Sequence, residues 1–202
     1  MLHLYGDSHS RFNFKNLRIP HLDHQQNSIT MFRIGRDNIL INFKPSDHNL
    51  HSILCITYGE VDCRCHIQRQ VNMGKDEDIV VIELVDNYFR TIKNNVLRFN
   101  KIIIVAVIPP TKQSDYESIH GPILHEFPFV GSDENRVRYT RKVNARIEEL
   151  CAKHGYIYFN PYGYYTREDG TLRHELSDTN VHLGENTYFL EQFTALYASI
   201  TS

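Results

Sequence analysis

Two uninterrupted apolar runs constrain the fold more than any other feature of this 202-residue chain. Residues 52–59 read Ser-Ile-Leu-Cys-Ile-Thr-Tyr-Gly, and residues 101–108 read Lys-Ile-Ile-Ile-Val-Ala-Val-Ile. Because runs rich in β-branched residues without polar alternation suit strands that are buried on both faces, they predict the centre of a parallel sheet. Shorter runs at 2–6, 29–35 and 155–161 predict three further strands.

Helical periodicity fills much of the sequence between these runs. Apolar residues recur three or four apart from Asp78 to Leu97 and from Asn135 to His154, and a final pattern begins at Phe189. Strands that alternate with helices predict an α/β domain over residues 1–202, on its own or within a longer chain. We expect three layers around a doubly wound, mostly parallel sheet of about five strands, with ligands bound beyond the carboxyl ends of the strands.

Composition argues against several classes of function. The net charge of −2 gives no basic surface for nucleic acid. No apolar run reaches the roughly 18 residues of a membrane span, and no signal-type segment opens the chain, so we expect a cytoplasmic protein without a membrane partner. The four cysteines form no disulfide framework and lack the ligand spacing of a zinc site, so we expect reduced thiols and no metal.

A serine follows the first predicted strand, and an acid and a histidine stand near the other end of the chain. The strand runs directly into Gly6–Ser8, and the segment Ser177–His182 precedes the last predicted helix. A serine hydroxyl becomes a nucleophile when a base takes its proton, and an imidazole base needs a carboxylate that orients it. Ser8, His182 and Asp178 are therefore candidates for these three roles. The alternative is a turn serine and a polar loop histidine.

This arrangement resembles the SGNH (GDSL-type) hydrolase and acyltransferase superfamily, which places Gly-Asp-Ser after its first strand and Asp-x-x-His before its last helix. The resemblance implies a three-layer α/β fold and chemistry through an acyl-serine intermediate. Ser8 would be the nucleophile, His182 the base and Asp178 the acid. Asp178 stands four residues before His182, where the family usually has three, which makes Asn180 an alternative orienting group.

The resemblance also implies donors for the oxyanion that forms during acyl transfer. The family uses the backbone amide of its serine, a glycine amide from a second block, and an asparagine side chain from a third block. Ser8 and Gly35 match the first two donors. The third position is Val61, which has no side-chain donor, so Arg64 and Arg36 are the candidates to replace it.

Charged residues near the predicted strand ends are candidates for binding the substrate. They are Asp7, Arg36, Glu60, Asp62 and Arg64. Arginine offers a planar donor pair for carboxylate or phosphate groups. The alternative is that Glu60, Asp62 and Arg64 form an ion-pair cluster that fixes a turn.

Together these features predict an SGNH-type acetyltransferase that moves a small acyl group onto a carbohydrate. A carbohydrate esterase or deacetylase is the alternative within the same chemistry. A non-catalytic carbohydrate-binding module is the alternative of another class, and the missing asparagine is its main support. We expect no tightly bound cofactor, acetyl-CoA as the acyl donor, and a small-molecule or glycan partner.

Overall fold

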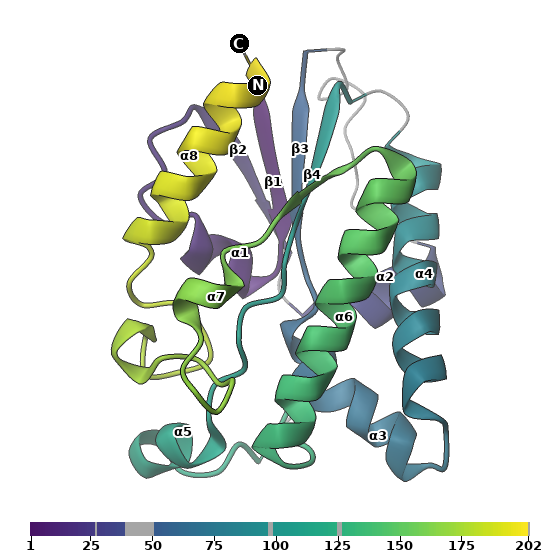
Figure 1. The fold of residues 1–202 in the computed structure, drawn as a ribbon, viewed down its shortest axis with the longest axis vertical. Coiled ribbons are helices and arrows are strands. Elements are labelled where there is room, and N and C mark those ends of the chain that lie inside the picture. The colour runs from purple at the N-terminus through teal and green to yellow at the C-terminus, as the bar shows by residue number, and fades with distance from the viewer. Residues whose placement is uncertain (27, 39–50, 97–98, 125–126, 202) are drawn as a thin grey trace.

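A parallel sheet of five strands runs through the centre of the molecule (Figure 1). The computed structural model describes residues 1–26, 28–38, 51–96, 99–124 and 127–201. The strands are β1 (Leu2–Gly6), β2 (His21–Gln25), β3 (Ile53–Thr57), β4 (Lys101–Val105) and β5 (Ile157–Phe159). Their order is β2-β1-β3-β4-β5 and every pairing is parallel, which confirms the predicted doubly wound α/β fold.

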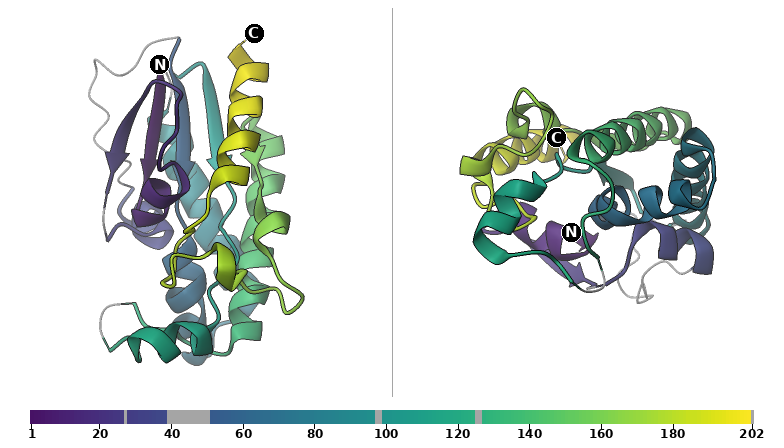
Figure 2. Two further views of the ribbon diagram at one scale, coloured as in Figure 1. Left: turned by 90° about the vertical axis from the view of Figure 1, so that its left-hand side faces the viewer. Right: turned by 90° about the horizontal axis from the view of Figure 1, so that it is seen from below.

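Alternate side chains of each strand point into two hydrophobic cores. In β4, Ile102 and Ile104 enter one core, and Ile103 and Val105 enter the other. The first core is covered by α2 (Met31–Asp37), α4 (Glu77–Asn95) and α6 (Asp133–His154). The second is covered by α8 (Thr187–Thr201) (Figure 2) and by Phe14 and Leu17, which follow α1 (Ser8–Asn13). Since both faces are covered, the central strands need apolar residues at nearly every position, as their sequences have.

Shorter helical elements lie between these strands and helices. A π-helical turn (Asp62–His66) leads into α3 (Ile67–Asn72), and a 3-10 turn spans His174–Leu176. The helices α5 (Gln113–His120) and α7 (Tyr162–Tyr165) lie toward the end of the sheet at which the strands finish (Figure 1).

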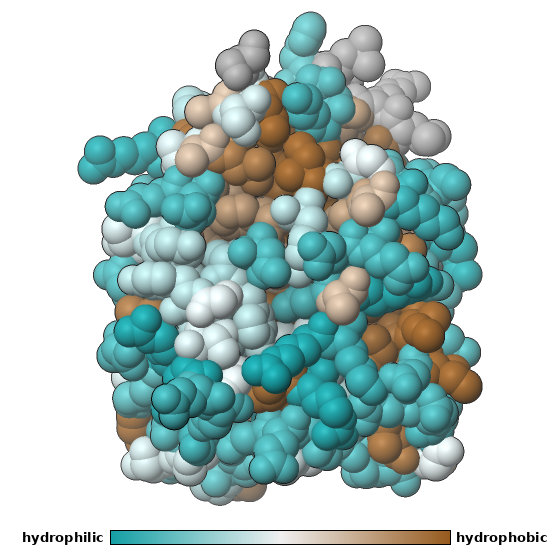
Figure 3. Space-filling view, in the orientation of Figure 1, coloured by the Kyte–Doolittle hydropathy of each residue, from teal (hydrophilic) through white to brown (hydrophobic). Residues whose placement is uncertain are grey.

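The long helices match the periodic segments of the sequence. The pattern from Asp78 corresponds to α4, whose predicted end at Leu97 lies outside the described residues, and the other two patterns correspond to α6 and α8. Figure 3 shows that the face with α6 and α8 is mainly hydrophilic, with an apolar patch near the end where the termini lie. Within the described ranges, every helix is too short or too polar to cross a bilayer.

The second strand lies earlier in the chain than the sequence predicts. Residues 29–35 form most of α2 instead of a strand, and the strand beside β1 is β2, which is largely polar and lies at the sheet edge. The Thr30 hydroxyl begins α2 by accepting the Arg33 N–H at 3.1 Å. The Asp62 carboxylate accepts the first two N–H groups of the helix at 2.8 and 3.1 Å. These caps, one of them distant in the sequence, explain why this segment is helical.

Candidate active site

A cleft of about 590 Å³ lies where β1 ends and α1 begins. The chain connects β1 first to β2 on one side and later to β3 on the other, and ligands bind at such a switch point in open α/β sheets. Ser8 is the first residue of α1, and the Asp7 carboxylate accepts the His9 N–H at 2.9 Å. A Cβ atom on Gly6 would lie 2.7 Å from the Thr57 carbonyl oxygen, so the close turn before Ser8 requires glycine.

Ser8, His182 and Asp178 form one hydrogen-bonded series in this cleft. Nε2 of His182 lies 2.9 Å from Oγ of Ser8, although 174 positions separate the two residues. Nδ1 of His182 lies 3.0 Å from Oδ2 of Asp178. Because the carboxylate accepts the Nδ1–H, Nε2 is left to accept the serine proton. The structure thus brings together the predicted nucleophile, base and acid in the geometry that serine acyl transfer requires.

A closed turn accommodates the extra residue between the acid and the histidine. Thr179 adopts a left-handed backbone with φ of 67°. Oδ1 of Asp178 accepts the N–H groups of Asn180 and His182 at 2.9 and 3.1 Å. The side-chain oxygen of Asn180 accepts the Val181 N–H at 3.0 Å. Asp178 therefore contacts the imidazole, and the alternative that Asn180 orients it is not observed.

Two aromatic rings pack near the His182 ring. The Phe12 ring is stacked 4.1 Å away with its plane 8° from parallel, and the His9 ring centre lies 4.6 Å away on a tilted plane. Burial holds the pKa of His182 below its usual value, although the hydrogen bond to Asp178 opposes this effect. Burial also opposes ionisation of Asp178, but the hydrogen bonds from His182 keep the pKa of that carboxyl below its usual value. These directions favour a neutral imidazole beside an ionised carboxylate.

Glu60, Arg64 and His9 form a buried charged cluster beside the triad. Their exposed fractions are 5%, 6% and 4%. Nε and Nη2 of Arg64 donate to the two Glu60 oxygens at 2.8 and 3.1 Å, and Nε2 of His9 lies 3.1 Å from Glu60 Oε2. The remaining guanidinium nitrogen, Nη1, donates to the Phe127 carbonyl. Arg64 does line the cleft, but all three of its nitrogens already bind protein oxygens. For Glu60 and Arg64 the ion-pair alternative is the one observed.

Two residues predicted to bind substrate are structural. Asp62 is 0% exposed and caps α2, so it is not available to a substrate, and burial raises its pKa to about 7. Glu60 is occupied by Arg64 and His9. Asp7 lines the cleft but is only 4% exposed, because its side chain caps α1.

Gly35 and Arg36 lie away from the cleft, because their segment is a helix and not the end of a strand. Gly35 faces α4, where a Cβ atom would come within 2.8 Å of the Asn87 Cβ, so its role is close helix packing and the predicted oxyanion role is wrong. Arg36 is exposed and pairs with Asp37 at 2.5 and 2.9 Å. It lines a separate pocket of about 160 Å³ that includes residues from α2, α3 and α4.

Sequence reasoning missed most of the residues that shape the cleft. Its walls include Arg11 and Phe12 of α1, Gln25 and Ser28–Thr30 before α2, and Ile123 and Phe127 between α5 and α6. Recognising Thr30 as a helix cap would have placed the preceding residues in a loop at the correct edge.

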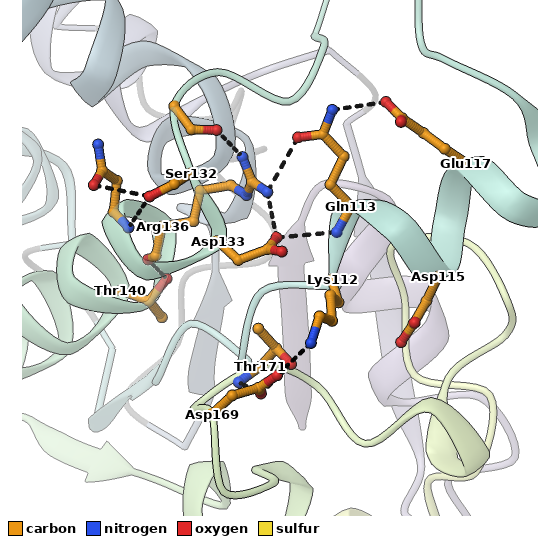
Figure 4. Close-up of polar contacts among 12 residues, drawn as sticks. Lys112, Gln113, Asp115, Glu117, Ser132, Asp133, Arg136, Thr140, Asp169 and Thr171 are labelled. Carbon is orange, nitrogen blue, oxygen red and sulfur yellow. Dashed lines mark hydrogen bonds and ion pairs between the residues drawn. The ribbon is translucent and has the colours of Figure 1, made fainter.

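The segment between α5 and α6 (residues 121–132, of which 125 and 126 are not described) is anchored by two arginines. The guanidinium group of the fully buried Arg136 donates hydrogen bonds to backbone and side-chain oxygens (Figure 4). These partners are Gly131, Asp133 and Gln113. The guanidinium groups of Arg64 and Arg136 lie 5.7 and 4.9 Å from the centre of the Phe129 ring. The Arg64 carbonyl accepts the Val130 N–H at 3.1 Å, so one wall of the cleft depends on Arg64.

The four cysteines are free thiols and all are buried. Burial raises the pKa of Cys55 and of Cys63, so both thiols are protonated near neutral pH and are poor nucleophiles. Among the described residues, no three histidine, cysteine or acidic side chains are grouped as metal ligands.

Comparison with known proteins gives similarity in structure but not in sequence. The chain matches no family model and no curated protein. A proposed acylhydrolase from Bacteroides fragilis has a TM-score of 0.57 at 13% identity, with 98% of this chain and 85% of that chain covered. A GDSL-like lipase from Bacteroides thetaiotaomicron has a TM-score of 0.57 at 14% identity, covering 98% and 86%. A member of the lipolytic G-D-S-L family from Veillonella parvula has a TM-score of 0.50 at 13% identity, covering 97% and 96%. This chain therefore has the fold of the SGNH (GDSL-type) hydrolases.

Proposed function

We propose that the chain is a serine esterase that hydrolyses esters of small acyl groups through an acyl-Ser8 intermediate. The observation that carries the proposal is the series from Ser8 through His182 to Asp178, with contacts of 2.9 and 3.0 Å. His182 has a depressed pKa and is therefore neutral near pH 7, as a base must be. The fold shared with lipases and acylhydrolases supports the same chemistry.

The reaction would proceed in two halves. Oγ of Ser8 attacks the ester carbonyl carbon while its proton moves to Nε2 of His182, and Asp178 stabilises the imidazolium that results. The imidazolium then protonates the alcohol oxygen as the bond between carbonyl carbon and alcohol oxygen breaks. In the second half, water attacks acyl-Ser8 and gives a proton to Nε2, which returns it to Oγ as the acid leaves.

Backbone groups are the donors that we propose for the oxyanion. Ser8 contributes its own amide, and the loop Ser28–Thr30 forms the part of the cleft wall from which a second amide could come. Val61 lines the cleft without a side-chain donor. Since one donor is worth roughly 10²–10³ in kcat, we expect slower turnover than in an enzyme with an asparagine at that position.

The composition of the cleft indicates the kind of ester. Apolar side chains would contact the acyl group; they are Phe12, Ile29, Val61, Ile123 and Phe127. Polar side chains would contact the alcohol; they are Arg11, Gln25, Ser28 and Asn180. The volume of about 590 Å³ is typical of a small-molecule site. We propose a short acyl group on a hydroxyl-rich alcohol such as a carbohydrate.

Acetyl transfer onto a carbohydrate is the second candidate, with acetyl-CoA as the donor. The polar cleft wall favours it, because a sugar hydroxyl bound there would compete with water for acyl-Ser8. The two functions share the first half of the reaction and differ in the group that attacks the acyl-enzyme.

The test uses p-nitrophenyl acetate with the wild-type chain and the Ser8→Ala variant. We expect steady release of p-nitrophenol and a mass increase of one acetyl group on the Ser8 peptide, both lost in the variant. Addition of a panel of sugars gives acetylated sugar if transfer is the function and leaves acetate as the product if hydrolysis is. Absence of turnover and of an adduct on Ser8 with acetyl to octanoyl esters would instead support the non-catalytic module.

A further inference from the structure

A small polar cavity adjoins the cleft at Asp7 and His9. Its volume is about 10 Å³, which is the space that one water molecule needs. Both residues line the cleft as well as this cavity. The remaining polar residues of its wall are Asn13, Thr57, Tyr58 and Glu60.

Five residues of this wall bury polar atoms that have no hydrogen-bond partner among the described residues. The atoms are Oδ2 of Asp7, Nδ1 of His9, both amide atoms of Asn13, Oγ1 of Thr57 and the Tyr58 hydroxyl. All five side chains are buried, with exposed fractions from 0% to 5%. Buried polar groups are rarely left without a partner, so convergent donors and acceptors around a space of this size point to a bound water molecule.

His9 connects this polar cavity with the base of the triad. Its Nε2 lies 3.1 Å from Oε2 of Glu60, and its ring centre lies 4.6 Å from the His182 ring. An imidazolium needs an acceptor for each of its two N–H groups. Glu60 is one acceptor, and a water molecule in the cavity, itself bound to Asp7 Oδ2, would be the other.

We propose that His9 is a positioning residue for His182: it carries a positive charge, held by Glu60 and by a water molecule in the polar cavity, and its ring centre lies 4.6 Å from that of the His182 ring. The proposal rests on the proposed function, in which His182 is the base. The other charged groups around His9 are Asp7 on its own turn, and Glu60 and Arg64 after β3. Burial disfavours the charged ring, but the two carboxylates prevail and raise the pKa of His9.

The consequence concerns the protonation of the base. A positive charge beside His182 opposes its protonation, so the imidazole stays neutral and can accept the serine proton at a lower pH than it would without His9. Phe12 stacks on the same imidazole ring but carries no charge. His9 therefore acts on the pH dependence of the site as well as on the position of the ring.

The test is a titration of ¹⁵N-histidine-labelled protein by NMR between pH 4 and 9, without substrate. In the wild type, both His9 nitrogens should carry protons at the pH at which His182 loses its proton. In the His9→Gln variant, the pKa of His182 should rise by roughly one unit or more, since a like charge at this distance is removed. The acid limb of kcat/KM should move upward by the same amount. The control is His154→Gln, which removes a ring that contacts Phe89 and Tyr156 instead of the cleft and should leave the pKa of His182 unchanged.

Two further measurements test the proposal if the His9→Gln variant does not fold. Glu60→Gln should lower the pKa of His9 in the same spectra, and a crystal structure should show one water molecule bonded to His9 Nδ1 and Asp7 Oδ2. A His9 ring that is neutral throughout the wild-type titration, or a His182 pKa that is the same in folded His9→Gln, would overturn the proposal, and a dry cavity would remove the water from it. Because the titration uses no substrate, these outcomes are independent of whether the chain hydrolyses esters.

Discussion

Two groups of polar residues at the same edge of the sheet have different roles. Ser8, Asp178 and His182 are partly exposed and meet one another at the cleft. Glu60, Asp62 and Arg64 follow the neighbouring strand, but they are at most 6% exposed and bind protein atoms. A polar residue at this edge is thus a candidate for chemistry when it is partly exposed at the cleft. It is structural when it is buried and protein groups occupy its polar atoms, even where it lines the cleft as Arg64 does.

The largest effect that we expect is from Ser8→Ala. Loss of the nucleophile should lower kcat for a small ester by roughly 10⁴–10⁶, because the acyl-enzyme cannot form. The free energy of unfolding should change little, since the Ser8 hydroxyl has a single hydrogen bond among the described residues, to His182. Steady-state kinetics together with urea unfolding would check both parts, and retention of a tenth of the activity would assign the chemistry to another residue.

Asp178→Asn should have the next largest effect. An amide in place of the carboxylate stabilises the imidazolium less and favours the wrong tautomer, so kcat should fall by roughly 10²–10⁴ with a smaller change in KM. The matched control is Asn180→Ala, which removes a side chain that accepts a backbone N–H and lines the cleft but does not hydrogen-bond the imidazole, so its effect should fall mainly on KM. Equal losses in both variants would show that the turn, and not the carboxylate, controls His182.

Asp62→Ala should lower the free energy of unfolding but have little effect on kcat. The substitution leaves two N–H groups of α2 without their buried acceptor, which should cost about 2–4 kcal/mol of the free energy of unfolding. Urea unfolding measures this cost, and kcat of the folded variant should remain within a few-fold of the wild type. A loss of kcat like that of Ser8→Ala, at unchanged stability, would place Asp62 with the catalytic group.

Arg36→Ala should have the smallest effect. Arg36 is exposed, pairs with Asp37 and lines a different pocket, so kcat/KM should change by less than about two-fold. A drop of tenfold or more would mean that the pocket beside α2 takes part in substrate binding.

The sequence was sufficient to predict a strand or helix where the hydrophobic pattern of that segment alone determines its structure. The apolar runs predict β1, β3, β4 and β5, and helical periodicity predicts α4, α6 and α8. It was insufficient for α2, because the Asp62 cap lies 31 positions from Met31, and for β2, because an edge strand of polar residues has no apolar pattern. The error at Gly35 follows from the error at α2.

The same distinction holds for the site. A short motif was enough to select Ser8 and His182, which lie 174 positions apart and meet at 2.9 Å. Glu60 and Arg64 have His9 and the Phe127 carbonyl as partners, and Asp178 contacts the imidazole across a turn in which Thr179 is left-handed. Contacts between distant segments, and the backbone conformation of a single turn, could not be predicted from residue type and spacing alone.

Reaction with a fluorophosphonate, followed by peptide mapping, tests the central claim most directly. We expect one covalent adduct, on Oγ of Ser8, and a rate of labelling that falls by about 10² or more in His182→Gln because the base is missing. Labelling that spares Ser8, or labelling of Ser8 at a rate that His182→Gln does not change, would contradict a serine nucleophile activated by His182.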